Sequence, residues 1–327
     1  MSANQELFEL KFYEWEEKFK DKPYLRQPIG EKWEEYTWGQ VGDMARRLAS
    51  GLKSLNLREG AHIGIYSKNC REWIISDLAI VMAGYVSVPF FPSLNGKELS
   101  YIMDYGDVDA LFIGKIETWD EIKNDLPAEM PIIRFPKYDG CSNVTIGHEW
   151  HEFINSHNPI QNPNTPKLSD LWTIIFTSGT TGNPKGVMLT YQAIDGIKVV
   201  LDDPNNPLGI KHTGNNDFIS YLPLNHIFER VVIEWCSFRY GGTISFVESI
   251  ETFGQNLKDV QPHVFAAAPR VWTKLQMGIL SKFPQKRLDT LLKIPLLSSV
   301  LKKLIRKGLG FSKVRVTVSG SAPMPVE

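Results

Sequence analysis

Short apolar runs alternate with amphipathic stretches along most of the chain, and this order constrains the fold more than any other feature. The run AHIGIYS (61–67) fits a buried strand, and residues 71–82 then repeat apolar side chains at helical spacing. A second strand-like run at 85–91 follows, and another strand is expected at 109–113. Because alternating strands and helices are typical of crossover connections, the pattern predicts an α/β fold with mainly parallel sheets covered on both faces.

A segment rich in proline and asparagine interrupts this alternation. Residues 157–168 (HNPIQNPNTPKL) hold three prolines and three asparagines, which neither a helix interior nor a central strand accommodates. We interpret the segment as a linker and predict a first α/β subdomain at residues 1–160 and a second at 161–327. Strands of the second subdomain are expected at 172–177, 217–221, 243–247, 263–267 and 314–318, with helices between them.

Composition excludes several classes of protein. Lysine and arginine number 36 against 37 acidic residues, and 43% of residues are hydrophobic, close to an average globular protein. No nucleic-acid partner is expected, because the basic excess of such binders is missing.

The charged amino terminus does not resemble a signal peptide, and no run approaches the roughly 20 apolar residues of a membrane span, so a cytoplasmic protein is expected. The three separated cysteines predict neither a zinc site nor a disulfide framework.

The most informative segment is an apolar strand that runs into TSGTTGNPKG (177–186). Glycines let a backbone approach a ligand closely, and turned N–H groups with hydroxyls and one lysine form a cradle for a polyphosphate. The alternative is a polar glycine-rich hairpin turn. A P-loop NTPase is a poor interpretation, because the order GxxGxxKG differs from GxxxxGK[ST]. The candidate phosphate-binding residues are Thr177, Ser178, Gly179, Thr180, Thr181, Gly182 and Lys185.

The longer stretch TSGTTGNPKGVMLT (177–190) resembles the phosphate-loop signature of adenylate-forming enzymes, which include acyl-CoA synthetases, peptide-synthetase adenylation domains and firefly luciferase. YLPLNHIFER (221–230) and VTVSGSAPMP (316–325) resemble two further family motifs in the same order. AAAPRVWTK (266–274) resembles a segment of long-chain acyl-CoA synthetases. The resemblance covers nearly the whole chain and implies two flavodoxin-like α/β subdomains, as in the amino-terminal region of these enzymes.

The resemblance also implies the chemistry: ATP-dependent activation of a long-chain fatty acid to acyl-AMP and pyrophosphate, then transfer to CoA. Thr177 is implied as the hydroxyl on the side of Mg²⁺, and Lys185 as a catalytic group at the phosphates. His226 is implied as a catalytic positioning group beside the carboxylate or α-phosphate, and the alternative is a helix-start histidine satisfied by the backbone. On the adenine face, the resemblance implies Gly320, Ser321, Ala322 and Pro323.

Motifs that the family carries beyond the adenine loop do not occur in this sequence. We therefore interpret the chain as an amino-terminal part whose carboxyl-terminal lid domain is absent. Because lid closure completes many active sites, little or no turnover is expected of the chain alone. Other adenylate formers stay open, namely a medium-chain or aryl-CoA ligase or a fatty acyl-AMP ligase. From another class, a non-catalytic nucleotide- or acyl-binding module also stays open.

Residues 286–310 carry seven basic side chains and one acidic side chain. On a helix, such a segment can lie in a membrane interface, so peripheral membrane contact is one expectation. The alternative is a solvated helix whose apolar face packs on the core. The apolar face is expected to comprise Leu297, Leu301, Leu304 and Ile305, surrounded by Lys302, Lys303, Arg306 and Lys307.

Overall fold

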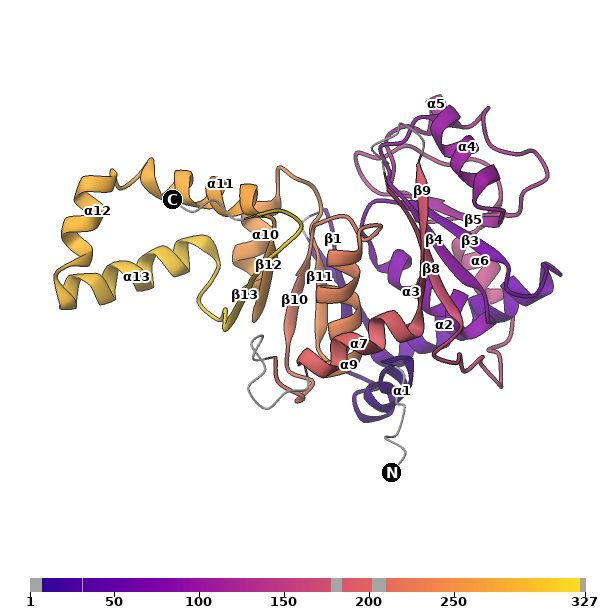
Figure 1. The fold of residues 1–327 in the computed structure, drawn as a ribbon, viewed down its shortest axis with the longest axis horizontal. Helices are drawn as coiled ribbons and strands as arrows, with labels where there is room; N and C mark the ends of the chain where they lie inside the picture. The colour runs from indigo at the N-terminus through magenta and orange to yellow at the C-terminus, as the bar shows by residue number, and fades with distance from the viewer. Residues whose placement is uncertain (1–7, 31, 178–183, 202–209, 324–327) are drawn as a thin grey trace.

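In a computed structural model of the chain, the described residues are 8–30, 32–177, 184–201 and 210–323. Their strands form two mainly parallel sheets, one of seven strands and one of six, which lie side by side (Figure 1). The predicted α/β fold with mainly parallel sheets is therefore confirmed. Each sheet ends in one antiparallel edge strand.

The seven-stranded sheet is buried on both faces, which explains why its central strands are continuous apolar runs. Helices α2, α3 and α6 cover one face, and α4 and α5 cover the other. The strand order is β7-β6-β5-β3-β4-β8-β9. Its elements are α2 (Trp38–Ser54), β3 (His62–Ser67), α3 (Arg71–Ala83), β4 (Val86–Phe90), α4 (Gly96–Tyr105), β5 (Val108–Gly114), α5 (Trp119–Ile122), β6 (Ile132–Arg134), β7 (His148–Glu149), α6 (Trp150–Asn155), β8 (Leu171–Thr177) and β9 (Lys185–Thr190).

The six-stranded sheet has the order β13-β12-β10-β11-β1-β2 and combines strands from both ends of the chain. Its elements, with the helices around it, are α1 (Phe8–Lys18), β1 (Pro23–Ile29), β2 (Lys32–Thr37), α7 (Tyr191–Leu201), β10 (Asp217–Ser220), α8 (Ile227–Glu229), the π-helix η1 (Arg230–Trp235), α9 (Cys236–Tyr240), β11 (Thr243–Phe246), α10 (Phe253–Val260), β12 (Val264–Ala267) and β13 (Val316–Ser319).

The division between the sheets does not follow the boundary expected at residues 160/161. Strand β1 pairs with β11 of the other half of the chain, and β8 pairs with β4. Residues 157–168 do not link the sheets, because they return the chain to β8 in the same sheet. The Ile160 N–H donates to the Arg46 carbonyl (3.1 Å), and the Asn164 N–H donates to the Met82 carbonyl (2.8 Å). The prolines therefore fit an extended segment that lies along α2 and α3.

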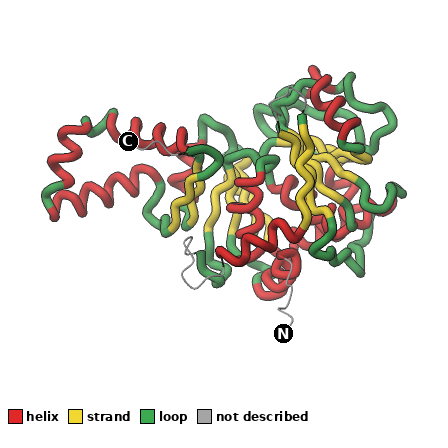
Figure 2. Tube along the Cα trace, in the orientation of Figure 1, coloured by secondary structure: helices red, strands yellow, loops and turns green. Residues whose placement is uncertain are grey.

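A third group of helices extends away from both sheets as an arm (Figures 1 and 2). It consists of α11 (Pro269–Leu280), α12 (Gln285–Leu292) and α13 (Pro295–Leu309). In the part of the chain that the structure describes, no helix is long and apolar enough to cross a membrane.

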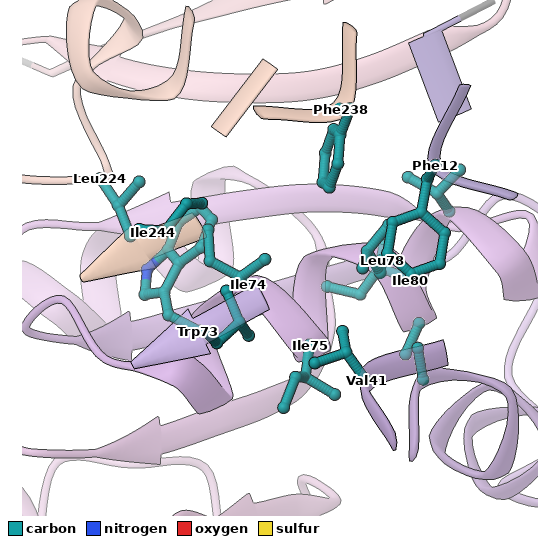
Figure 3. Close-up of a cluster of buried hydrophobic side chains, with 14 of the residues drawn as sticks. Phe12, Val41, Trp73, Ile74, Ile75, Leu78, Ile80, Leu224, Phe238 and Ile244 are labelled. Carbon is teal, nitrogen blue, oxygen red and sulfur yellow. The ribbon is translucent and has the colours of Figure 1, made fainter. Parts of the chain in front are cut away.

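One of three hydrophobic clusters among the described residues contains residues of both sheets (Figure 3). It includes Phe12 of α1, Val41 of α2, Trp73 of α3 and Ile244 of β11. Helix α3 lies at the centre of this core, and all of its residues are buried. Its charged residues Arg71, Glu72 and Asp77 are buried as well, and α3 contacts strands of both sheets, namely β3, β4 and β1.

Candidate active site

The candidate residues lie after the carboxyl ends of parallel strands that belong to different sheets. Thr177 ends β8 of the seven-stranded sheet, whereas His226 follows β10 and Gly320 follows β13 of the six-stranded sheet. Ligands of open α/β sheets bind at this edge of the strands. The two sheets must therefore keep a fixed relative placement if these residues are to act on one ligand.

Thr177 and Lys185 are opposite residues of the antiparallel pair formed by β8 and β9. Both residues are exposed, so a hydroxyl and an ammonium group lie at the two ends of the glycine-rich loop. The antiparallel pairing of β8 with β9 at the two ends of this segment is compatible with both interpretations, a polyphosphate cradle and a polar hairpin turn. The remaining candidates of the loop lie outside the described residues: Ser178, Gly179, Thr180, Thr181 and Gly182.

His226 begins α8 as its N-cap residue. The Phe228 N–H donates to His226 Nδ1 at 3.2 Å, so a neutral ring carries its proton on Nε2. The residue is exposed, and Nε2–H can therefore donate to a ligand. His226 thus accepts a backbone hydrogen bond at Nδ1, as the alternative interpretation expected, and its Nε2–H is still available to bind a ligand.

The segment that follows β13 lies against the helix that His226 caps. A Cβ atom added to Gly320 would lie 2.4 Å from Cε2 of Phe228, so only glycine allows this close approach. Ser321 has a φ of 68°, a backbone conformation that residues other than glycine rarely adopt. Ala322 and Pro323 are exposed. The structure thus brings Gly320 against Phe228, two residues after His226. Among the described residues, no hydrogen bond or ion pair joins His226 or the segment 320–323 to Thr177 or Lys185.

A buried arginine connects these two groups of residues. Arg230 is fully buried, and its guanidinium contacts Asp77 Oδ2 (2.5 Å) and Glu234 Oε2 (3.0 Å) and donates to Thr173 Oγ1 (2.8 Å). The guanidinium carbon lies 4.0 Å from the Trp172 ring centroid. Thr173 precedes Thr177 by four residues on β8, and Arg230 follows His226 by four residues. The contact therefore ties the strand before the glycine-rich loop to the helix after His226.

Electrostatics keep this arginine charged in the core. Burial opposes its charge, but the carboxyl groups of Asp77 and Glu234 outweigh this effect and raise the pKa of Arg230. Burial also raises the pKa of Glu229 to about 8, although hydrogen bonds from the Ser220 hydroxyl and the Tyr221 N–H oppose the increase. The sequence predicted no catalytic role for Glu229 or Arg230. Charges inside the apolar stretch 227–239 are the signal that could have indicated a buried polar network.

The described residues contain no group of three or more His, Cys, Asp or Glu side chains that could hold a metal ion. Mg²⁺ binds through a few protein oxygens, water and substrate phosphates in many phosphoryl-transfer sites. The exposed Thr177 hydroxyl, at the mouth of the loop, fits this kind of coordination.

Fold and site define a class of protein: an α/β protein that presents a glycine-rich, lysine-containing hairpin loop and an N-cap histidine at the carboxyl ends of its strands. The sequence pattern described as "AMP-binding enzyme" matches residues 12–327. The chain belongs to this family, the adenylate-forming superfamily that its motifs resemble.

Several curated relatives are named as acyl-CoA synthetases. The chain is 30% identical to "Long chain acyl-CoA synthetase 5" of Arabidopsis thaliana, over 88% of this chain and 48% of that protein. It is also 30% identical to "Long-chain-fatty-acid--CoA ligase 5" of Rattus norvegicus, over 90% of this chain and 47% of that protein. The chain spans about half the length of the curated relatives it matches.

Solved structures share the fold at low identity. The adenylation domain of a carboxylate reductase from Mycobacterium chelonae has a TM-score of 0.76 at 17% identity, over 98% of this chain and 55% of that chain. The anthranilate CoA ligase AuaEII, in complex with anthranoyl-AMP, has a TM-score of 0.73 at 18% identity, over 98% of this chain and 56% of that chain. The two sheets are thus those of the amino-terminal region of adenylation enzymes.

Proposed function

We propose that the gene product is an ATP-dependent long-chain fatty-acid–CoA ligase and that this chain provides its phosphate, adenine and acyl-carboxylate contacts. The observation that carries the proposal is the pairing of Thr177 with Lys185 at the mouth of the glycine-rich loop, in a chain of the AMP-binding enzyme family. The names of the relatives at 30% identity support the long-chain substrate.

The proposed reaction has two steps. In the first, a fatty-acid carboxylate oxygen bonds to the α-phosphorus of ATP, and the bond to the β-phosphate oxygen breaks, which releases pyrophosphate. In the second, the CoA thiol loses its proton and attacks the acyl carbon, which forms the thioester and releases AMP. The protein needs no nucleophile of its own, so its task is to position two anions and to stabilise the charge that develops on them.

Each candidate residue has a defined part in this proposal. The ammonium group of Lys185 would neutralise charge on the β- and γ-phosphates, and the loop residues 178–182 would donate hydrogen bonds to them from hydroxyl and N–H groups. The Nε2–H of His226 would donate to an oxygen of the carboxylate or α-phosphate. Bound Mg²⁺, with the Thr177 hydroxyl as a ligand, would supply further charge neutralisation at the phosphates. Adenine would lie along the segment formed by Gly320, Ser321, Ala322 and Pro323.

ATP–pyrophosphate exchange on the complete gene product tests the proposal, with acetate, octanoate, laurate, palmitate and benzoate as acids. We expect exchange to be greatest with laurate or palmitate, and Lys185→Ala to lower it about 100-fold, as loss of a charge-stabilising donor does in other enzymes. The matched control is Lys167→Ala, an exposed lysine in the segment before β8. This chain of 327 residues, tested in parallel, is expected to show little exchange.

Other outcomes distinguish the alternatives. Greatest exchange with octanoate or benzoate would assign a medium-chain or aryl-CoA ligase instead. Exchange with palmitate but no thioester on addition of CoA would assign a fatty acyl-AMP ligase. Nucleotide binding without exchange for any acid would contradict the enzyme assignment and favour a non-catalytic binding module.

We also propose that α13 contacts an anionic membrane surface, because its exposed apolar side chains form one stripe. Leu296, Val300 and Leu304 recur at four-residue spacing and are 84%, 58% and 59% exposed. The stripe differs from the expected face, since Leu301 instead packs inward at 7% exposure. Apolar residues flanked by cations are typical of interfacial helices. The flanking exposed cations are Lys302, Lys303, Arg306 and Lys307.

Co-sedimentation with phosphatidylcholine vesicles, with and without phosphatidylserine, tests this surface on the complete gene product. We expect binding that requires phosphatidylserine and that is lost when the four cations become Glu or when Leu296 and Val300 become Gln. The matched control replaces Lys97 and Lys137, exposed residues near the other sheet, with Glu. Binding that survives the four-residue change, or its absence in the unmodified protein, would overturn the proposal.

A further inference from the structure

Asn69 reaches from the seven-stranded sheet into the loop that carries His226. It lies between β3 and α3, and its side-chain Nδ2 donates to Ser220 Oγ (2.8 Å) and to the Leu222 carbonyl (2.6 Å). Its Oδ1 accepts a hydrogen bond from the Leu224 N–H (3.0 Å). One side chain thus makes three hydrogen bonds to the segment 220–224, which ends two residues before His226.

A buried lysine fixes the backbone of Asn69 at the same place. Lys115 follows β5, is 5% exposed, and its Nζ donates to the carbonyl groups of Asn69 (2.8 Å) and Val247 (3.3 Å). Val247 follows β11 of the other sheet. The Lys115 backbone has a φ of 44°, which residues other than glycine adopt only where the surroundings impose it. Lys115 therefore joins the carboxyl edges of the two sheets beside Asn69.

The segment 220–224 is also hydrogen-bonded by Glu229, a residue of α8 beside the six-stranded sheet. Glu229 Oε1 accepts hydrogen bonds from Ser220 Oγ (2.9 Å) and from the Tyr221 N–H (3.0 Å). The side chain of Leu224 is buried in the cluster that also contains Trp73 (Figure 3). The loop therefore has little freedom up to Leu224, while His226 beyond it is exposed.

We propose that Asn69 is a positioning residue that sets the location of His226 relative to Thr177 and Lys185. The inference rests on the proposed function above, because it deepens the role given to His226. Asn69 belongs to the sheet that carries Thr177 and Lys185, and it holds the loop of the sheet that carries His226. The carboxamide of asparagine offers both N–H donors and an oxygen acceptor. An aspartate of the same length lacks the donors, and an aliphatic side chain lacks both. Small displacements of a positioned group lower the rate of a reaction steeply.

The test is a double-mutant cycle on the complete gene product, measured by palmitate-dependent ATP–pyrophosphate exchange. We expect Asn69→Ala to lower kcat about 10- to 100-fold, with KM for ATP changed less than about 2-fold. In a His226→Ala background, Asn69→Ala should lower kcat no further, because the group that it positions is gone. Asn69→Asp keeps the acceptor for the Leu224 N–H but places a second oxygen against the Leu222 carbonyl, so it should not restore kcat.

Hydrogen exchange followed by mass spectrometry provides a readout that needs no substrate. We expect Asn69→Ala to speed exchange in the peptide 221–229, which contains the amides of Leu224 and Phe228. The matched control is Asn216→Ala at the opposite end of β10, where Nδ2 donates to carbonyl groups of Lys211 (2.8 Å) and Gly241 (2.9 Å). That variant should leave both kcat and exchange in 221–229 unchanged.

Three outcomes would overturn the proposal: multiplicative losses in the double mutant, equal effects of Asn216→Ala, or unchanged hydrogen exchange in 221–229. A His226→Ala variant with normal kcat would overturn it as well. Failure of the proposed function is distinguishable, because the unmodified protein would then show no exchange with any acid while the hydrogen-exchange comparison still reports on the loop.

Discussion

At the scale of single residues, Glu229 illustrates how a buried carboxyl group can stabilise a loop in its neutral form. Its Oε1 accepts two hydrogen bonds, and its Oε2 has no hydrogen-bond partner within the described ranges. Charging such a group in the core is unfavourable, and the pKa of Glu229 is accordingly raised to about 8. Protonated Glu229 is therefore expected to be the form that holds Ser220 and Tyr221.

This raised pKa predicts a specific pH dependence of stability. Between its usual value of 4.5 and the folded value of about 8, the folded protein keeps a proton that the unfolded chain has lost. The contribution of Glu229 is thus complete below this window and decreases as pH rises through it, by at most about 1.4 kcal/mol per pH unit. Glu229→Gln should remove this contribution, because an amide accepts the same bonds without ionising.

Urea unfolding at several pH values from about 5 to about 8 checks the prediction. The free energy of unfolding of the unmodified chain should decrease relative to that of Glu229→Gln as pH rises. Glu121→Gln, at an exposed position of α5, is the control and should leave the profile unchanged. Parallel profiles for the unmodified chain and Glu229→Gln would contradict the assignment.

At the scale of elements, Gly310 determines how the arm returns to the six-stranded sheet. It ends α13 in the left-handed region, with a φ of 80°, and the following Phe311 N–H donates to the Arg306 carbonyl (2.7 Å). A Cβ atom at Gly310 would lie 2.4 Å from the Leu257 carbonyl oxygen. Both the backbone conformation and the contact with α10 therefore require glycine here.

Replacement by alanine should consequently have opposite effects on stability at Gly308, inside α13, and at Gly310, which follows its last residue. Gly310→Ala is expected to lower the free energy of unfolding by about 1–3 kcal/mol, through backbone strain and the contact with Leu257. Gly308 is inside the helix, where a Cβ atom meets nothing within 4 Å, so Gly308→Ala should raise it by about 0.5–1 kcal/mol. Urea midpoints of the two variants measure both changes, and a decrease for both would be evidence against this account of the arm.

Elements also differ in how far the sequence predicts them. The buried strands β3 and β4 are the apolar runs that the sequence predicts, and the apolar spacing of residues 71–82 predicts a helix where α3 lies. The hairpin of β1 and β2 was missed, because β2 is a largely exposed edge strand without apolar alternation and β1 contains two prolines. Its place in the six-stranded sheet depends on pairing with β11, more than 200 residues away, which local patterns do not encode.

The residues of the candidate site also differ in how far the sequence predicts them. Motif spacing predicts Thr177, Lys185 and His226, and their roles stay predictions. Asn69 has no local signal, because its importance comes from partners on the other sheet. Arg230 is noticeable only as a charge inside an apolar stretch, and its partner Thr173 on the other sheet is not encoded locally. At the scale of the whole molecule, the site therefore depends on contacts between sheets that only the three-dimensional arrangement reveals.

Arg230 makes a fully buried contact between the sheets. Its removal should allow the two sheets to unfold at different urea concentrations. Arg230→Met leaves the carboxyl groups of Asp77 and Glu234 buried without a cation, which should destabilise the chain by about 3–5 kcal/mol. Thr173→Val removes the hydrogen bond from the guanidinium and also the one that Thr173 Oγ1 donates to the Ser87 carbonyl (2.7 Å), so a loss of about 1–3 kcal/mol is expected. Combining Arg230→Met with Asp77→Asn and Glu234→Gln should recover much of the loss, because no unpaired charge then stays buried.

Hydrogen exchange in increasing urea measures this coupling between sheets. In the unmodified chain, amides of β3 and β10 should lose protection together, because one hydrophobic cluster spans both sheets. In Arg230→Met, β10 should lose protection at a lower urea concentration than β3, since η1 no longer binds α3 and β8 through the guanidinium. Coincident loss of protection at an unchanged urea midpoint would mean that apolar packing alone holds the sheets together, and that Arg230 does not fix the placement of His226 relative to the glycine-rich loop.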